Sequence, residues 1–488
     1  MPASTAEAAL TIRNLWIRDR EGGVLVRNVS LSLPRGGVLT LIGETGSGKS
    51  LIAQALFGML PEGLKVEGTI HLAGQPPIPA GDARQLAALW RSTLALVPQE
   101  PARAFDPTMT VGRQMALAGM GEGEVASSLR TFDLPEAVGR AYPFALSGGM
   151  AQRVLVAWAL GLGSPVVVAD EPTKGLDADR VTQAVSALAA LARAGRSLLV
   201  ITHDRRVAED LPGTLAILRD GEIVEQGEST AVLAAPVSDY ARTWLDADPR
   251  HWPRCLRCCD MSSLALSAHG LAFAWPGQAP LFRAVDLHLP RGGVLAVAGP
   301  SGSGKSTLGD ILLGIRRPSA GSVEWSGVDI VADPSAIRPR RQRYQKLHQD
   351  PASTFVPHLP LARQFLALRE VRPGLAIERE MPPLLERLKV RPSLLGRRPG
   401  EISGGEAQRL ALARILLLDP VAIVADEPTS RLDPVVQRET MSLLRSIVDQ
   451  RGLGLVLIGH DRAMLRAIAD DRLELGIAER AASSSRLA

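Results

Sequence analysis

The chain has 488 residues, of which 46% are hydrophobic and 22% are charged, a composition typical of globular proteins with large buried cores. Its formal net charge of +4 is too small for a chain of this length to indicate a nucleic-acid-binding protein. Apolar runs such as VLTLIG have the length of strands and fall short of the roughly 18 residues that a membrane-spanning helix needs.

The first residues, MPASTAEAALTIRN, lack the charged and apolar regions of a signal peptide. The three cysteines are an odd number, which argues against a disulfide framework. We therefore expect a cytosolic protein. The arginine-rich run RPRRQRYQK, at residues 338–346, is interpreted as solvated surface rather than as a patch for lipid or nucleic acid.

In chain order, the predicted elements alternate between strands and helices, which indicates an α/β fold with a parallel sheet. The run VLTLIG at 38–43 predicts a short strand, GETGSG a turn, and KSLIAQALFGML at 49–60 a helix. Between Gln99 and Ser147 the strand pattern disappears, which predicts a helical insert. The runs VVVAD and SLLVITH, which begin at 166 and 197, are continuous and apolar, as expected of strands buried on both faces.

The same motifs return later in the chain at nearly constant spacing. The lysines of GETGSGKS and GPSGSGKS are 305 − 49 = 256 residues apart, and so are the serines of LSGGMAQR and ISGGEAQR (403 − 147) and the aspartates of VVVADEPT and AIVADEPT (426 − 170). This internal duplication predicts two tandem domains of one fold. The predicted boundaries are domain 1 at 1–245, with a helical insert at about 100–158, a linker at 246–263, and domain 2 at 264–488, with a helical insert at about 350–414.

Both glycine-rich stretches have the form GxxxxGK[ST] between a predicted strand and a predicted helix, which is the pattern of a phosphate-binding loop. Their glycines let successive backbone N–H groups point at an anion, the lysine reaches the terminal phosphates, and the hydroxyl after it is expected on Mg²⁺. We therefore predict two P-loop NTPase domains, each a mainly parallel sheet flanked by helices, that bind ATP and Mg²⁺. The predicted ATP ligands are Gly43, Gly46, Ser47, Gly48, Lys49, Ser50 and Leu51, and Gly299, Gly302, Ser303, Gly304, Lys305, Ser306 and Thr307.

Each copy also has an apolar strand that ends in Asp-Glu. The aspartates, Asp170 and Asp426, are predicted to hold the Mg²⁺ shell together with the loop serines. The glutamates, Glu171 and Glu427, stand one residue further on, where a carboxylate can orient and deprotonate an attacking water. These two glutamates are the predicted general bases.

The set of phosphate loop, glutamine, SGG motif, ADEPT, LD turn and histidine resembles the ABC-type ATPase family, over nearly the whole chain and twice. The resemblance implies that the two halves close head to tail on two ATP molecules, each phosphate loop facing the SGG motif of the other half. The resemblance implies that Gln99 and Gln349 contact Mg²⁺ and the attacking water, and that His203 and His460 contact the γ-phosphate. It implies that Asp177 and Asp433 lie at the interface between the halves. The residues implied to contact the γ-phosphate held by the opposite half are Ser147, Gly148, Gly149, Ser403, Gly404 and Gly405.

The copies differ where the resembled family usually stacks adenine on an aromatic residue ahead of the phosphate loop. The second copy has Trp275 there, in FAWPG. The first copy has Asp19 or Arg20 at this place, so either the Arg20 guanidinium or Trp16 is the candidate for stacking.

The helical insert indicates what the ATPase drives. The stretches QEPARAFDPTMTVGRQM and HQDPASTFVPHLPLARQF resemble ATPases of dipeptide, oligopeptide and nickel importers, although the second has Val356-Pro357 where that family has Asn-Pro. The resemblance implies a peripheral protein on the cytoplasmic face of the inner membrane. Its implied partners are two membrane-spanning permease subunits and an extracytoplasmic substrate-binding protein, with peptides, nickel or metal chelates as cargo and no nucleic acid.

Two other classes remain open from the sequence. One is the tandem ATPase of a sugar importer, although such proteins usually have degenerate motifs in the second half, whereas both glutamates are present here. The other is a soluble ABC protein, either an accessory of a phosphonate-degrading complex or one that acts on ribosomes or DNA.

The cysteines, Cys255, Cys258 and Cys259, lie within five residues of one another. An iron–sulfur cluster usually needs four thiolates, so a cluster here would require His251 as the fourth ligand. We expect a reduced linker at this place instead.

Overall fold

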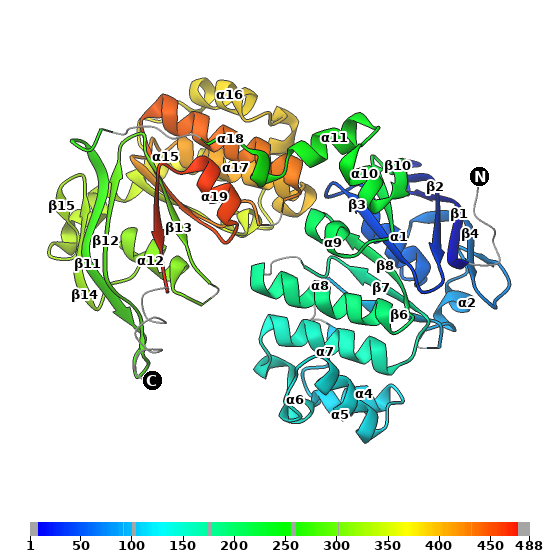
Figure 1. The fold of residues 1–488 in the computed structure, drawn as a ribbon. Coiled ribbons are helices and arrows are strands. Elements are labelled where there is room, and N and C mark those ends of the chain that lie inside the picture. The colour runs from blue at the N-terminus through cyan, green and yellow to red at the C-terminus, as the bar shows by residue number, and fades with distance from the viewer. Residues whose placement is uncertain are drawn as a thin grey trace. The chain divides into compact units, whose positions relative to one another are not determined.

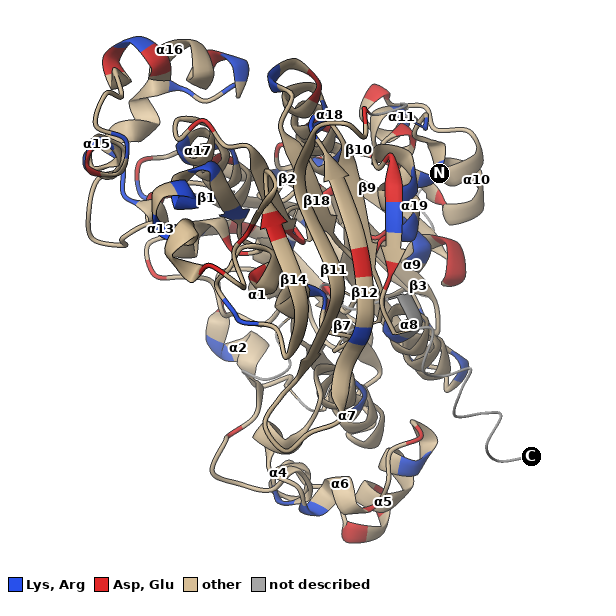
Figure 2. Cartoon of the chain, turned by 90° about the vertical axis from the view of Figure 1, so that its left-hand side faces the viewer, with Lys and Arg blue, Asp and Glu red and all other residues tan. Residues whose placement is uncertain are grey.

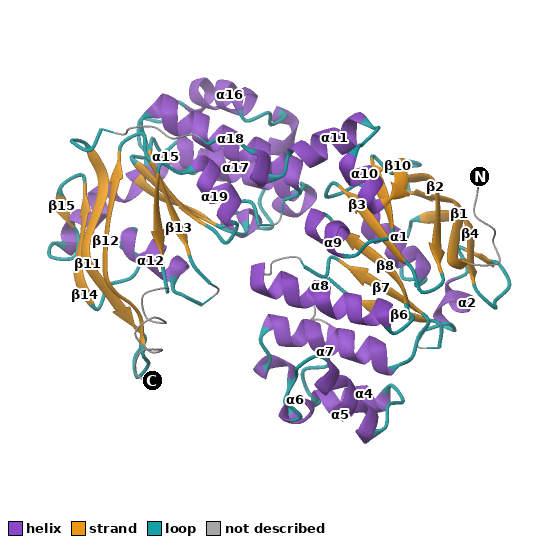
Figure 3. Cartoon of the chain, viewed as in Figure 1, coloured by secondary structure: helices purple, strands orange, loops and turns teal. Residues whose placement is uncertain are grey.

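The computed structural model describes residues 8–90, 92–99, 104–173, 178–254, 260–300, 302–430 and 432–476. The chain divides into two compact units, Met1–Asp246 and Ala247–Ala488. Each unit contains two sheets and a set of helices (Figures 1 and 3). Among the described residues, no helix combines the length and the apolar character that crossing a bilayer requires.

The central sheet of the first unit positions the predicted site residues. Its strands lie in the order β10-β9-β3-β8-β7-β6, and all neighbours are parallel except β10 and β9. Strands β3 and β8 are buried along their whole length because helices cover one face and a second sheet covers the other. The strands are β3 (Val38–Gly43), β6 (Leu94–Val97), β7 (Val166–Asp170), β8 (Ser197–Thr202), β9 (Thr214–Arg219) and β10 (Glu222–Glu228).

A second, antiparallel sheet of order β2-β1-β4-β5 was not expected from the sequence. Its strands are β1 (Ala8–Arg18), β2 (Val24–Pro34), β4 (Lys65–Leu72) and β5 (Ile78–Pro79). Leu10 and Ile12 of β1 share one buried cluster with Leu39 of β3 and Ile52 of α1. The helix that follows the phosphate loop is therefore held between the two sheets.

Helices make up the rest of the first unit. Those between the glutamine and the SGG motif pack, through Val111, Met115 and Leu129, into a buried cluster that also contains Val167 of β7 and Leu198 of β8. The helices are α1 (Lys49–Leu56), α2 (Ala83–Ala87), α4 (Val111–Leu117), α5 (Glu122–Thr131), α6 (Ala137–Arg140), α7 (Gly148–Gly161), α8 (Ala178–Arg193), α9 (Arg205–Asp210), α10 (Ser229–Ala234) and α11 (Asp239–Asp246).

The second unit repeats this plan. Its parallel sheet has the order β16-β17-β18-β13-β19, and its antiparallel sheet the order β12-β11-β14-β15. Helix α12 lies between the two sheets (Figure 1). The strands are β11 (Leu264–Ala274), β12 (Pro280–Pro290), β13 (Val294–Ala298), β14 (Ala320–Trp325), β15 (Val328–Asp329), β16 (Tyr344–Leu347), β17 (Ala422–Asp426), β18 (Gly454–Ile458) and β19 (Asp471–Glu474). The predicted fold class, two tandem α/β domains with mainly parallel sheets, is confirmed.

The helices of the second unit are α12 (Lys305–Leu312), α13 (Ile337–Arg340), α14 (Leu361–Leu366), α15 (Leu368–Val371), α16 (Ile377–Arg387), α17 (Gly404–Leu416), α18 (Pro434–Arg451) and α19 (Arg462–Ile468). Acidic and basic residues lie side by side on α16, whereas β11 and β14 carry few charges (Figure 2). This distribution follows from burial, because charged side chains are costly to remove from water.

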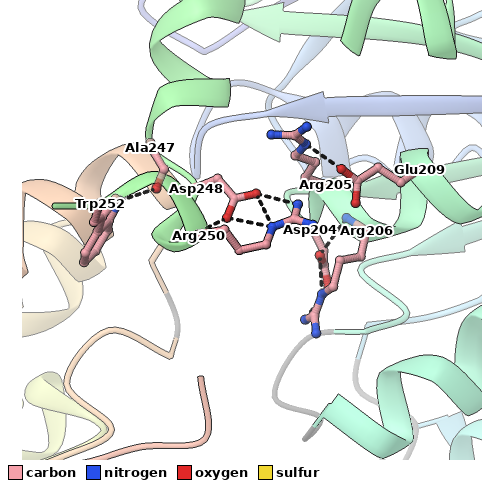
Figure 4. A network of polar contacts seen from close by, with 8 residues as sticks. All are labelled: Asp204, Arg205, Arg206, Glu209, Ala247, Asp248, Arg250 and Trp252. Atoms are coloured by element: carbon pink, nitrogen blue, oxygen red, sulfur yellow. Dashed lines mark hydrogen bonds and ion pairs between the residues drawn. The ribbon is translucent and has the colours of Figure 1, made fainter. Parts of the chain in front are cut away.

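Residues 247–254, which the sequence analysis assigned to the linker, pack on the second unit. Trp252 is 8% exposed and belongs to the same core cluster as Ala467 and Ile468 of α19, and its indole N–H donates to the Ala247 carbonyl at 2.9 Å. Asp248 accepts two short hydrogen bonds from the Arg250 guanidinium (Figure 4). The three cysteines lie outside the described residues.

Candidate nucleotide sites

The first phosphate loop surrounds a buried lysine. Gly46 and Gly48 adopt φ angles of 88° and 102°, in the left-handed region that glycine tolerates, and Gly48 caps the start of α1. Lys49 is 6% exposed, and its ammonium donates to the Gly43 and Glu44 carbonyls at 2.7 Å. A Cβ atom on Gly43 would lie 2.3 Å from the Leu218 carbonyl oxygen, so this position admits only glycine.

The second loop has the same geometry. Gly304 caps α12 with φ 91°, and the Lys305 ammonium donates to the Gly299 and Pro300 carbonyls at 2.8 and 2.9 Å. In both loops a serine hydroxyl, of Ser47 or Ser303, is buried without a hydrogen-bond partner among the described residues. Phosphate oxygens would satisfy these donors, so the loops fit a nucleotide. Leu51, Thr307 and the loop serines Ser50 and Ser306 lie in the first turns of α1 and α12.

A hydroxyl and a carboxylate meet beside each loop. Ser306 Oγ donates to Asp426 Oδ1 at 3.1 Å, and Ser50 Oγ lies 3.5 Å from Asp170 Oδ1. These are hard oxygen donors of the kind that Mg²⁺ prefers, so the residues present fit the metal that the sequence predicts. Gln99 lines a cavity of about 350 Å³ together with Ser50 and Asp170. No cluster of three or more His, Cys, Asp or Glu suited to another metal site occurs among the described residues.

Both predicted bases have an unusual backbone. Glu171 and Glu427 adopt φ angles of 49° and 46°, which residues with a side chain rarely do. Their N–H groups donate to the Ile201 and Ile458 carbonyls of the neighbouring strands, at 2.7 and 3.0 Å. Such strain concentrates at functional sites because the surrounding structure must hold it in place.

Each glutamate lies against a histidine. His203 Nδ1 is 2.8 Å from Glu171 Oε2, and His460 Nδ1 is 3.4 Å from Glu427 Oε1. The hydrogen bond with His460 lowers the pKa of Glu427, burial opposes it, and the charges of His460 and Lys305 lower it further. Glu427 is therefore ionised at neutral pH and able to accept a proton.

Caps on the following helices fix the two histidines. Asp204 accepts from the Arg206 N–H at 3.0 Å and binds the Arg206 guanidinium at the start of α9 (Figure 4). Asp461 caps α19 in the same way after His460. In the same view, Arg205 pairs with Glu209 at 2.7 Å (Figure 4).

The glutamine of the second copy, Gln349, contacts the predicted base Glu427. Gln349 Nε2 donates to Glu427 Oε2 at 2.9 Å and lies 3.4 Å from the Ser430 hydroxyl. In this structure Gln349 therefore contacts the predicted base directly, and Glu427 has polar neighbours on both of its oxygens.

Both SGG motifs begin a helix whose first turn is open. Ser147 caps α7 by accepting from the Met150 N–H, and Ser403 caps α17 by accepting from the Glu406 N–H, both at 3.3 Å. No atom lies within 4 Å of a Cβ built on Gly148 or Gly404, while Gly149 and Gly405 have one side chain each at ordinary contact distance. The first N–H groups of each helix are thus accessible to an anion. Asp433 caps α18 and is buried; Asp177 lies outside the described residues.

The residues ahead of the phosphate loops differ between the copies. Trp275 is 37% exposed, and the Arg316 guanidinium lies 4.6 Å from the centre of its ring. In the first copy Asp19 accepts from two N–H groups of its own loop, and the Arg20 guanidinium donates to the Glu62 carbonyl at 3.3 Å. Trp16 faces the guanidinium of Arg18 at 4.8 Å.

Two features of the site were missed in the sequence. Lys346 was assigned to solvated surface, but only 14% of its side chain is exposed because it lies between two carboxylates, Asp310 and Asp426. This part of the arginine-rich run is therefore not surface. The other is Glu406, whose carboxylate accepts from Ser403 and completes a capping box, and the spacing S-x-x-E in ISGGE is its sequence signal.

Comparison with known families agrees with this geometry. The family model described as "ABC transporter" matches residues 26–174 and again residues 282–430. The chain belongs to the ABC transporter family. It is a tandem ABC ATPase, and we call its two copies the first and second cassettes. ATP binding and hydrolysis follow from the family.

Two relatives align over most of their length. The "Peptidoglycan transport ATP-binding protein YejF" of Agrobacterium fabrum is 32% identical, over 96% of this chain and 91% of the relative. The "Glutathione import ATP-binding protein GsiA" of Salmonella typhi is also 32% identical, over 91% of this chain and 80% of the relative. Among solved structures, an archaeal ribosome recycling factor, aABCE1, in complex with a stalk protein, has a TM-score of 0.65 at 19% identity over 96% of this chain and 92% of its own. At that identity the likeness concerns the fold alone.

Proposed function

We propose that the chain is the ATP-hydrolysing component of an importer and drives two permease subunits that are separate polypeptides. The observation that carries this proposal is that both cassettes have the complete set of loop lysine, serine–aspartate pair and histidine-bound glutamate. The two relatives that align along most of this chain are named for transport and import. The protein would act from the cytoplasmic face of the inner membrane, bound to the permeases.

The proposed cargo is peptide-like and is delivered by an extracytoplasmic binding protein. The relatives are named for peptidoglycan and glutathione, and both compounds contain amino acids joined by amide bonds. This favours peptides over nickel or metal chelates, which the sequence alone left equal.

In each cassette we propose the same division of roles. Lys49 and Lys305 bind the terminal phosphates. Mg²⁺, when bound, would offset the charge of the phosphates. The loop serines and the aspartates that end β7 and β17 would hold it, together with Gln99 and Gln349. Glu171 and Glu427 take the proton of the attacking water. The histidines orient these carboxylates and contact the γ-phosphate, and the hydrogen bond with His460 lowers the pKa of Glu427.

We also propose that each site is completed by the other cassette. The first N–H groups of α7 and α17 are accessible and can bind an anion, and in the proposed arrangement that anion is the γ-phosphate held by the phosphate loop of the other cassette. Gly404→Asp, which puts a carboxylate at the start of α17, should then abolish hydrolysis at the Lys49 site and spare nucleotide binding at Lys305.

Reconstitution tests the importer proposal. The chain should co-purify with two hydrophobic permease chains encoded beside it, and in proteoliposomes its ATPase rate should rise when peptide-loaded binding protein is added. The double variant Glu171→Gln, Glu427→Gln is the control, because it should bind the permeases and give no uptake. Sedimentation with ribosomes, together with ATPase activity that ribosomes stimulate and permeases do not, would overturn the proposal.

A further inference from the structure

A lysine lies between two carboxylates behind the second phosphate loop. The Lys346 ammonium donates to Asp310 Oδ1 at 2.8 Å and lies 3.4 Å from Asp426 Oδ2. The other oxygen of Asp426 accepts from Ser306 Oγ at 3.1 Å. One carboxylate thus contacts both the hydroxyl proposed for Mg²⁺ and a positive charge that belongs to the protein.

The positions of these residues in their elements bring them together. Strand β16 runs parallel to β17 with Lys346 beside Val424, and Asp426, two residues further on, points to the same face of the sheet. Asp310 stands one helical turn after Ser306 on α12, so both side chains face the end of β17. The Lys346, Asp310 and Asp426 side chains are 14%, 23% and 11% exposed, so solvent weakens their interaction only partly.

The first cassette has no charge at the two corresponding positions. Leu96 is the third residue of β6 and lies beside Val168, and Gln54 stands one turn after Ser50 on α1. Both line the cavity of about 350 Å³ that also contains Asp170. Lysine and arginine are lacking from the described lining of this cavity, and Gln54 Oε1 is buried without a partner among the described residues.

We propose that Lys346 is a specificity-determining residue that makes the second cassette bind divalent cations more weakly, and metal-free nucleotide more strongly, than it otherwise would. The inference rests on the proposed position of Mg²⁺ beside Ser306 and Asp426. The ammonium offsets negative charge that would attract a divalent cation, which lowers metal affinity. The same charge offsets the repulsion between two carboxylates and the nucleotide phosphates when no metal is bound. One residue therefore acts on two affinities in opposite directions.

The test uses the full chain and measures binding rather than turnover. In a Lys49→Ala background, which disables the first loop, Mn²⁺ binding in the presence of a non-hydrolysable ATP analogue is followed by electron paramagnetic resonance. Analogue binding in EDTA is measured by calorimetry. Lys346→Leu, which installs the residue of the first cassette, should tighten Mn²⁺ binding about tenfold and weaken metal-free analogue binding about tenfold. Lys346→Arg keeps the charge and should leave both affinities within about twofold.

The reciprocal change provides a second, independent test. In a Lys305→Ala background, Leu96→Lys should weaken Mn²⁺ binding at the first cassette, so the proposal does not depend on the folding of Lys346→Leu alone. A residue with a merely structural role would weaken both affinities in Lys346→Leu. That outcome, or no change in either affinity, overturns the inference. Absence of nucleotide-dependent Mn²⁺ binding in both parent backgrounds overturns it together with the proposed Mg²⁺ position, whereas the importer proposal is decided separately by reconstitution.

Discussion

The two cassettes share the residues that would meet the γ-phosphate and differ in what surrounds them. Each has a loop lysine bonded to two carbonyls and a left-handed glutamate within 3.4 Å of a histidine. They differ ahead of the loop, where the second cassette has Trp275 beside Arg316, and beside the metal position, where it has Lys346 in place of Leu96. We expect hydrolysis to constrain the first group in both copies, and we expect the surroundings, which include Trp275 and Lys346 in the second cassette, to be where the copies can differ.

Replacement of the two glutamates should have the largest effect on activity, and it tests whether the two cassettes are equivalent. Glu171→Gln and Glu427→Gln should each lower steady-state ATPase turnover at least about 100-fold, because the amide cannot accept the proton of the attacking water and because, in the proposed head-to-tail arrangement, the halves open for the next cycle only after both sites have hydrolysed ATP. ATP binding, measured by calorimetry, should persist in both. If one variant keeps near-normal turnover, the cassettes are not equivalent and that site is regulatory.

Trp275 should contribute more to ATP binding than any residue at the corresponding place in the first cassette. Trp275→Ala should weaken ATP binding at the second cassette about tenfold, since stacking of a base on an aromatic ring contributes roughly 1–3 kcal/mol. Arg20→Ala is the matched variant, and because Arg20 is already bonded to the Glu62 carbonyl we expect a change of at most about twofold. Equal losses in the two variants would mean that Arg20 leaves its carbonyl to stack on adenine.

The N-terminal cap of α17, the helix that begins at the second SGG motif, should have a smaller effect, which concerns the stability of the fold. Glu406→Ala should lower the free energy of unfolding by about 1 kcal/mol, because it removes the capping box at Ser403. Met150→Glu copies this residue into the first cassette, but it also removes an apolar side chain that packs on the core, so we expect no gain in stability there. Urea denaturation measures both, and a clear gain in Met150→Glu would show that the cap outweighs the packing of Met150.

The smallest expected effect is on stability at acid pH. The folded-state pKa of Glu427 lies below its usual 4.5, so the stability it contributes is fully present above pH 4.5 and is lost as the pH falls through the lowered pKa. Glu427→Gln should therefore flatten the fall in melting temperature below pH 4.5 and leave its pH dependence near neutrality unchanged. A steeper fall in the variant would contradict the direction of the shift.

The sequence predicted the parts of the site that lie within a few residues of each other. The loops, the Asp-Glu strand ends and the SGG helix starts are local patterns whose chemistry follows from residue type and order. The duplication strengthened each of them, since a chance match does not repeat at the same spacing.

The features that could not be predicted from the sequence depend on packing between segments that are far apart in the chain. Lys346 looked like one more cation in an arginine-rich run, because nothing local places it between α12 and β17. The contact of Gln349 with Glu427 joins residues 78 positions apart. The antiparallel sheet was missed because its strands, such as β1 and β4, pair across the phosphate loop and not with their neighbours alone.

The left-handed backbone conformation of Glu171 and Glu427 bears on how the two halves of a duplicated protein diverge in sequence. Glycine would occupy these two backbone positions with less strain, so a glutamate there is expected only where its carboxylate has a function. A half that stopped turning over its nucleotide would be free to drift toward glycine or asparagine at this point. The presence of a strained glutamate in both halves therefore favours the prediction that both sites hydrolyse ATP.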